Sequence, residues 1–403
     1  MNTKHIQHLY WRAGFGISPD HLYKMRSRNR KEVVKELFND SRRTTPLYID
    51  LSEFETINPM TILKNPKKIR EFIKRSRALI KDYNIAWVER LSNSDASLRE
   101  RMTLFWANHF SCKDNNILYV QQYNNTLRRY ALGNLKDFVK AISREPAMLK
   151  YLNNKQNVKL SPNEKFAREI MELFTLGKGH YSETDITESA RAFTGYFHNF
   201  EGVFRVRKLM HDYGTKQFLG YRGRFDGDDI IDIIFSKKQC ARFICEKIYG
   251  YFVNDKLNTS HIDQMVEVLY PKYNIDQLMR FVFMSDWFYN EEHIGAKIKS
   301  PIDFVVGLNR SVPMNFKDPV QLIAVQKILG QVLLDPPNVA GWKGGRSWID
   351  SNTILLRLRL PSMLLNNAYI SKKEKGEFND AMSDMMSSRN NNKGYFKVES
   401  DWK

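Results

Sequence analysis

Several carboxylates and a histidine lie close together between residues 161 and 195, and side chains of these types can hold a metal ion or move a proton. Glu164, Glu169 and Glu172 recur at helix-like spacing, and His180 follows them in a turn. Carboxylates and imidazoles bind divalent metals and serve in general acid–base catalysis. The competing interpretation is helix capping and surface ion pairing, because no tight ligand spacing such as H-E-x-x-H is present.

Three more residues extend this candidate site. His109 ends an aromatic helical segment, where it could be a core or capping residue as well as a ligand or base. His211 and Asp212 stand in a glycine-rich loop, and loops on a rigid scaffold commonly carry function. We predict that His180 and His211 approach the carboxylates in one cleft, unless His180 only ends a helix and the other two only form a turn. The predicted catalytic residues are His109, Glu169, His180, His211 and Asp212.

Flat rings beside glycines predict a ligand pocket. The stretch DPPNVAGWKGGRSW, at 335–348, reads as a rigid loop that either closes the end of a helical body or lines a pocket with rings and backbone amides. Arg12, between aromatic residues and glycines, could face an anion or form a structural ion pair. The predicted pocket residues are Arg12, Asn108, Asn163, Trp342 and Trp348.

Helices must position these residues, because 3.6-residue periodicity with start and stop signals runs through most of the chain. Short helices are expected within 3–40. Longer helices are expected at 67–91, 97–110, 116–131, 134–144, 226–235, 238–252, 259–270, 274–285, 301–312, 319–329 and 352–370.

The 161–195 stretch is expected to form two helices joined at a glycine turn. Ser161 should cap the first helix in a capping box with Glu164, and Ser182 or Thr184 should cap the second. Arg168 is four residues from both Glu164 and Glu172, so both pairings are expected. One alternating patch, at 196–206, predicts a hairpin, whereas the glycine-rich stretch that follows reads as a loop. The fold class predicted is mainly α, a multi-helix bundle with a small β-hairpin and long Gly/Pro-rich loops.

Length and composition indicate a globular protein. The chain has 403 residues, and its 42% hydrophobic content supports a real core. We predict one large helical domain at 1–370, which could divide into a basic half at 1–160 and a motif-rich half at 161–370, followed by a flexible polar tail at 371–403. Three cysteines are too few for a disulfide framework and are expected to be buried free thiols.

Charge and hydropathy indicate which binding partners and which cell compartment to expect. Residues 1–160 carry 30 Lys and Arg against 15 Asp and Glu, so most of the net +18 lies there. The charges are scattered and lack a nucleic-acid signature, so solvated helix faces are favoured over binding of DNA or RNA. No transmembrane run and no signal-peptide core is evident, which predicts a cytoplasmic protein, or a periplasmic or extracellular one if a leader was removed.

Several motifs resemble one bacterial family, domain of unknown function 1800. They are WRAGFG (11–16), FWANHF (105–110), SPNEKFAREIMELFTLGKGHYSETDI (161–186), ARAFTGY (190–196), FLGYRGRFDGDD (218–229) and DPPNVAGWKGGRSWI (335–349). The resemblance implies a helical bacterial protein whose gene often neighbours a family similar to alkaline phosphatases and sulfatases. It therefore suggests a phosphatase- or sulfatase-like partner, and it supplies no catalytic residue.

Two functions follow as hypotheses. One is a hydrolase-like or metal-assisted enzyme whose motif residues converge on one cleft lined by His, Glu, Asp and Trp. The other is a non-catalytic helical scaffold that docks a partner. A divalent metal is the cofactor that the first hypothesis allows, without a preference for one metal.

Overall fold

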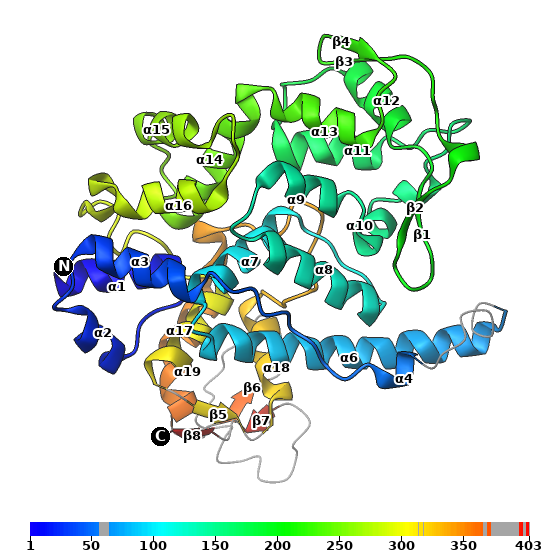
Figure 1. Cartoon of the computed structure of the whole chain (residues 1–403). Coiled ribbons are helices and arrows are strands. Elements are labelled where there is room, and N and C mark those ends of the chain that lie inside the picture. Colours follow the sequence, from blue (N-terminus) through cyan, green and yellow to red (C-terminus); the bar gives the residue numbers. More distant parts are fainter. Residues whose placement is uncertain are drawn as a thin grey trace.

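The computed structural model describes residues 1–55, 64–312, 314–316, 318–365, 369–371, 395–397 and 400–402. Helices dominate these residues, and they pack around a central pair formed by α7 and α8 (Figure 1). The prediction of a mainly α fold is therefore confirmed.

Helices fall close to the predicted bounds. They are α1 (Thr3–Ala13), α2 (Pro19–Met25), α3 (Arg30–Asp40), α4 (Ser52–Glu55), α6 (Pro66–Asn93), α7 (Ser97–His109), α8 (Ile117–Tyr130), α9 (Leu135–Ile142), α10 (Pro146–Tyr151), α11 (Lys165–Glu169), α12 (Glu183–Ala192), α13 (Gly227–Phe235), α14 (Lys238–Phe252), α15 (Thr259–Leu269), α16 (Ile275–Met284), α17 (Pro301–Ser311), α18 (Val320–Leu329) and α19 (Ser351–Leu365). Short helical turns are η1 (Asn154–Gln156), the π-helical η2 (Ile170–Thr175), η3 (Lys208–Met210), η4 (Asp286–Tyr289) and η5 (Gly345–Trp348).

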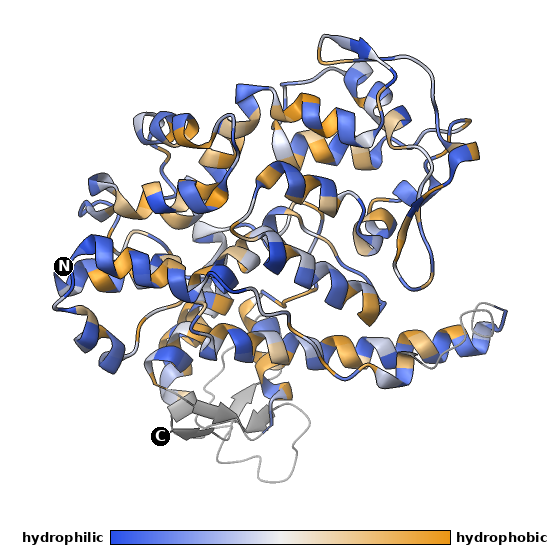
Figure 2. Cartoon of the chain, in the orientation of Figure 1, coloured by the Kyte–Doolittle hydropathy of each residue, from blue (hydrophilic) through white to orange (hydrophobic). Residues whose placement is uncertain are grey.

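Amphipathic faces and polar caps explain these helices. Apolar and polar residues alternate along helices such as α3 and α6 (Figure 2). Asn65 caps α6 by accepting from the N–H of Lys67 at 3.0 Å, and Pro66 begins the helix without losing a hydrogen bond. The larger of two apolar clusters joins buried residues from Ile6 to Tyr289, and the smaller one lies where α6 contacts α17 and α18.

The predicted hairpin is confirmed. β1 (Tyr196–His198) pairs antiparallel with β2 (Phe204–Val206). The next glycine-rich stretch, expected to be a loop, contains a second hairpin of β3 (Lys216–Phe218) and β4 (Tyr221–Gly223). Its sequence carries no signal of alternation, because strands of three residues are too short to show one.

The expected cap at Ser161 is wrong. The Ser161 N–H donates to the carbonyl of Val158 at 2.9 Å, which holds Ser161 in a turn, and α11 begins only at Lys165. Asn163 supplies the cap instead, because its Oδ1 accepts from the N–H of Lys165 at 3.0 Å. By contrast, one of the two residues predicted to cap α12, Ser182, does so, and it forms a reciprocal pair with Asp185.

The expected pairing of Arg168 is half right. Arg168 contacts Glu164 at 3.3 Å, but its second partner is Glu183 at 2.8 Å. Glu172 instead accepts a hydrogen bond from the hydroxyl of Tyr181 at 2.7 Å. Arg168 therefore pairs with Glu183 of the next helix in place of Glu172 on its own helical segment.

The expected flexible tail, 371–403, lies mostly outside the described residues. Its described pieces are strands: β7 (Tyr395–Lys397) pairs with β6 (Tyr369–Ser371), and β8 (Ser400–Trp402) pairs with β5 (Met314–Phe316). The division of the chain at residue 160 stays a prediction. All three cysteines are buried free thiols, as expected, and none of the described helices is long and apolar enough to cross a bilayer.

Candidate functional site

A cleft of about 570 Å³ opens between α7, α14 and the loop that carries Trp342, and we call it the Trp342 cleft. Its walls come from segments far apart in the sequence. The side chains that decide its chemistry are Asn108, His109, Tyr251, Asp255, Lys297, Trp342 and Trp348.

The side chain of Asn108 fixes the Trp342 loop on α7. Its Oδ1 accepts from the N–H of Trp342 at 2.7 Å, and its Nδ2 donates to the carbonyl of Trp342 at 3.3 Å. Gly341, at φ +75°, lets the loop approach this closely, because a Cβ there would collide with Asn108 Oδ1. The Trp342 ring is buried, so the loop both closes the helical body and lines the cleft.

His109 reaches the cleft from an aromatic setting. Its Nε2 lies 2.9 Å from the carbonyl of Phe174, and since a carbonyl only accepts, Nε2 carries the proton. The ring stacks on Phe105 with centroids 6.0 Å apart. Burial lowers the pKa of His109 to about 4, so the imidazole is neutral at pH 7.

Two ion pairs line the same cleft. Arg101 of α7 pairs with Asp303 at the start of α17, and both side chains are largely buried. The Arg101 guanidinium also lies 4.7 Å from the centre of the Tyr251 ring. The second pair is Lys297 with Asp255.

The Lys297–Asp255 pair is the more accessible of the two. The Lys297 side chain is 14% exposed and that of Asp255 is 50% exposed. Burial lowers the pKa of Lys297, and the Asp255 carboxylate opposes this shift. Gly345, at φ +62°, brings the Trp342 loop to Asp255, because a Cβ there would lie 3.1 Å from Asp255 Oδ2. The pair therefore combines a proton donor and a proton acceptor in the cleft wall.

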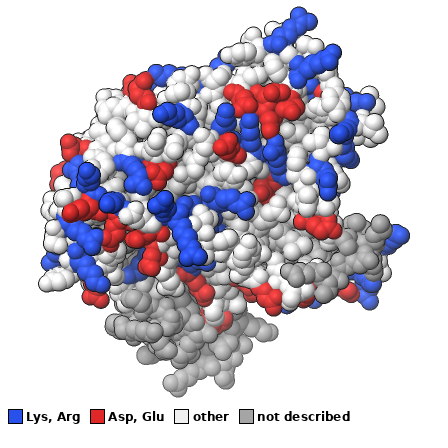
Figure 3. All heavy atoms as spheres, in the orientation of Figure 1, with Lys and Arg blue, Asp and Glu red and all other residues white. Residues whose placement is uncertain are grey.

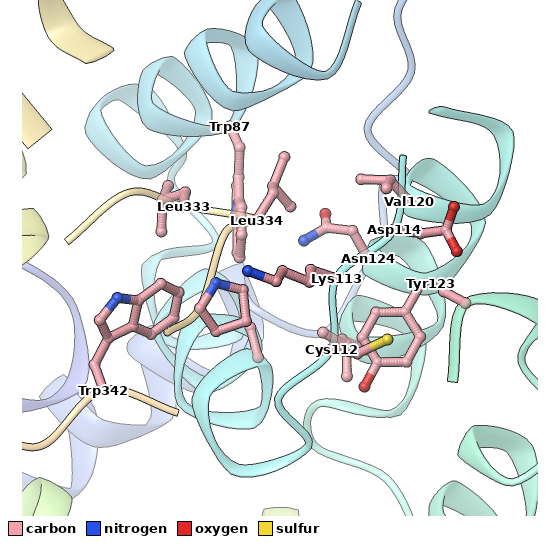
Figure 4. Close-up of a pocket in the computed structure, with 14 residues that line it drawn as sticks. Trp87, Cys112, Lys113, Asp114, Val120, Tyr123, Asn124, Leu333, Leu334 and Trp342 are labelled. Carbon is pink, nitrogen blue, oxygen red and sulfur yellow. The ribbon is translucent and has the colours of Figure 1, made fainter. Parts of the chain in front are cut away.

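Behind Trp342 lies a smaller, mostly apolar cavity of about 30 Å³ (Figure 4). Trp87, Leu334 and Trp342 are among its walls, and the side-chain amide of Asn124 points into it. Asn124 Nδ2 is buried without a hydrogen-bond partner among the described residues. The volume suits one or two water molecules, so we regard this cavity as a packing feature that supports Trp342.

The predicted site residues separate into two groups. Asn108, His109, Trp342 and Trp348 share the Trp342 cleft. His180 is exposed and lines a different, polar depression beside Asp185, at the start of α12.

The remaining predicted residues make structural contacts outside the lining of the Trp342 cleft. The Arg12 guanidinium donates to the carbonyl of His293 at 2.7 Å, and Asn163 caps α11. His211 Nδ1 lies 2.8 Å from the carbonyl of Thr194. Asp212 pairs with Arg191 at 2.7 Å. Glu169 is half-buried, and burial, helped by the charge of Glu172, raises its pKa. In the described part of the chain, no group of three or more His, Cys, Asp or Glu side chains is arranged to hold a metal ion.

The sequence did not single out Arg101, Asp255, Lys297 and Asp303, the charged residues that form the two ion pairs of the cleft. Arg101 stands four residues before the FWANHF motif, which is a usable signal on a helix. Asp255 and Lys297 stand in irregular segments outside every motif, and only the tertiary fold brings them together.

Comparison with known proteins identifies the family of the chain but gives no individual relative. No match was found among curated proteins or among solved structures. The family model described as "Protein of unknown function (DUF1800)" matches residues 8–396, nearly the whole chain, which confirms the resemblance seen in the motifs. The chain therefore belongs to the DUF1800 family.

Proposed function

We propose that the protein binds a small polar organic molecule with at least one ring in the Trp342 cleft and acts on it as a hydrolase-like enzyme. The observation that carries the proposal is the Lys297–Asp255 ion pair in the wall of an aromatic cleft of about 570 Å³. That volume is within the range usual for small-molecule sites.

Aromatic side chains support the binding part of the proposal. Trp342 and Trp348 approach from the loop, and Phe243 and Tyr251 from α14. Flat rings bind other rings through a large contact area at a low cost in side-chain entropy. The charged groups between them would fix the orientation of a polar ligand.

The ion pair supports the hydrolytic part. Hydrolysis needs a base that takes a proton from the attacking water and an acid that protonates the leaving group. Asp255 would accept the water proton as the water oxygen bonds to the reacting atom, and the Lys297 ammonium would protonate the departing oxygen as its bond breaks. The proton on Asp255 then returns to the Lys297 amine, so the pair ends in its starting state.

His109 has a supporting part in this proposal. Its neutral imidazole donates to the carbonyl of Phe174 and packs against Phe105, so it orients the cleft wall. Its lowered pKa makes it a weak base.

A panel of nitrophenyl esters, phosphates, sulfates and glycosides tests the proposal. We expect release of nitrophenol from one class, and a loss of about 10²–10⁴-fold in kcat for Asp255→Asn and for Lys297→Met. Lys256→Met, an exposed neighbour outside the cleft lining, is the matched control and should retain activity.

Ligand binding is measured separately by thermal unfolding with the same compounds and their products. Trp348→Ala should abolish any ligand-induced rise in Tm. A chain that hydrolyses no class and shows no rise in Tm would contradict the proposal and favour the non-catalytic scaffold, alone or with a phosphatase- or sulfatase-like partner.

A further inference from the structure

Two neighbouring turns beside the β1–β2 hairpin each expose a leucine almost completely. Leu160 is 90% exposed and Leu209 is 83% exposed, the highest values among the large apolar side chains that the structure describes. Single exposed leucines are ordinary on protein surfaces, but two on adjoining turns need an explanation.

Backbone hydrogen bonds hold these turns together. Leu160 stands at the corner of a turn closed by the Ser161 N–H and the carbonyl of Val158 at 2.9 Å, and Leu209 is in the middle of η3. The N–H of Lys159 donates to the carbonyl of Met210 at 2.9 Å, which joins the two turns. The leucines are therefore presented by a fixed frame.

Basic residues lie close to both leucines along the chain. In chain order they are Lys155, Lys159, Arg205, Arg207 and Lys208. Arg207 donates to the carbonyl of Lys155 at 2.7 Å, so the two basic segments are in contact. Within the described residues, none of these five side chains lies within ion-pair distance of a carboxylate. Burial, followed by the nearby charges of Arg207 and Lys150, lowers the pKa of Lys155. Lys155 and Arg207 also lie over the Phe197 ring, 5.4 and 5.0 Å from its centre, so the exposed Lys159, Arg205 and Lys208 are the cations most available to an anionic partner.

This arrangement differs from the mixed charges that Figure 3 shows over most of one face of the molecule. On the face shown in Figure 3, basic and acidic side chains are interspersed, as expected for solvated helix faces. The turn of Leu160 and the turn of Leu209 combine exposed apolar tips with one sign of charge. We call this set, Lys155, Lys159, Leu160, Arg205, Arg207, Lys208 and Leu209, the basic-leucine face.

We propose that the basic-leucine face docks the protein onto a bilayer that contains anionic phospholipids. The cations would contact the head groups, and Leu160 and Leu209 would enter the boundary between head groups and acyl chains. Peripheral membrane binding combines these two contributions, an electrostatic attraction and a buried apolar area. This proposal does not depend on any reaction in the Trp342 cleft.

Co-sedimentation of the full chain with lipid vesicles tests the proposal. We expect binding to vesicles of phosphatidylcholine with phosphatidylglycerol, and little binding to phosphatidylcholine alone. Binding should fall steeply in about 1 M salt, where the Debye length is about 3 Å. Each of Lys159→Gln and Lys208→Gln should lower the partition coefficient about five-fold. The double variant Leu160→Ser with Leu209→Ser should lower it about ten-fold or more.

Two control variants keep the test specific. Leu358→Ser replaces a leucine that is 73% exposed on α19, and Lys31→Gln removes an exposed charge on α3, and both should bind like the wild type. Thermal unfolding confirms that every variant is folded. Absence of binding to anionic vesicles, or equal loss in the controls, would overturn the proposal, as would vesicle binding that the leucine and lysine changes leave intact. A preference for an acidic protein over anionic vesicles would also overturn it.

Discussion

Asn108 and Trp342 are 234 residues apart in the sequence, and the side-chain amide of one makes two hydrogen bonds with the backbone of the other. This contact attaches the Trp342 loop to α7, the helix that also supplies Arg101 and His109 to the cleft. Asn108 therefore helps to hold this wall of the cleft in place, together with Ser111, whose hydroxyl donates to the carbonyl of Asn338 in the same loop at 2.9 Å.

Replacing Asn108 by Ala should weaken the attachment of this loop. The change removes both hydrogen bonds and leaves the Trp342 N–H without its partner, so we expect a loss of about 1–3 kcal/mol in the free energy of unfolding. Urea denaturation of the two proteins measures it. Asn163→Ala, which removes only the capping acceptor of α11, is expected to cost about 1 kcal/mol. A loss of less than about 0.5 kcal/mol for Asn108→Ala would mean that water replaces the side chain.

Replacing Trp342 by Ala should cost more, because this residue is only 8% exposed and its ring also borders the small cavity in Figure 4. We expect a loss of about 3–5 kcal/mol in the free energy of unfolding. The half-buried Trp348 offers a matched control in the same loop, and Trp348→Ala should cost less. Equal losses for the two changes would contradict the role of Trp342 as an anchor.

Local signals in the sequence were enough to place most helices. For example, α14 occupies 238–252, as predicted, because periodicity and flanking breaks are encoded within the segment itself. The cap at Ser161 failed because its N–H is used by Val158 in a turn that local spacing does not reveal. The β3–β4 hairpin was missed because its strands are too short to alternate.

The candidate site was predictable only where a motif carried it. Asn108 and Trp342 stand in motifs rich in aromatic residues and glycine, and they meet in the cleft. Lys297 and Asp255 have no local signature, since their pairing depends on how α14 and α17 are placed. His211 had the right residue type for chemistry, but a buried histidine can equally bond a nearby carbonyl, and here its Nδ1 lies against that of Thr194.

The stability of the protein should fall as the pH drops below about 6.5, in part because of His8. Burial, then the charge of Arg12, lowers the pKa of His8 to about 4 in the folded chain. The unfolded chain has a His pKa of about 6.5 and therefore binds the proton first. The contribution of neutral His8 to the free energy of unfolding is therefore complete above about pH 6.5. It is lost as the pH falls toward 4, and the loss reaches about 2 kcal/mol at pH 5.

Comparing the free energy of unfolding of the wild type and of His8→Asn isolates the pH dependence that His8 causes. Asn can still donate to the carbonyl of Phe288, which His8 Nε2 contacts at 3.0 Å. Urea denaturation at pH 7.5 and at pH 5 should show a smaller pH effect in the variant. The comparison also cancels the opposite contribution of Glu145, whose pKa burial raises to about 7. The same pH effect in both proteins would show that His8 is not the responsible group.

The ion pair between Glu100 and Arg128 should be the most sensitive electrostatic contact in the core. Arg128 Nε lies 2.7 Å from Glu100 Oε1, and the two side chains are 0% and 2% exposed. Trp87 donates a further hydrogen bond to Glu100 Oε2 at 3.3 Å. Glu100→Gln leaves a buried guanidinium without its counter-charge, so we expect a loss of about 3–5 kcal/mol in the free energy of unfolding.

A surface pair provides the control for this change. Glu164 and Arg168 are 3.3 Å apart with side chains 40% and 37% exposed, so Glu164→Gln should cost less than about 1 kcal/mol. The double change Glu100→Leu with Arg128→Leu should cost less than the sum of Glu100→Leu alone and Arg128→Leu alone, because it leaves no unpaired charge in the core. Urea denaturation of the wild type, these two single variants and the double variant completes the double-mutant cycle. An additive result would mean that water reaches the pair and screens it, which the complete burial of Arg128 argues against.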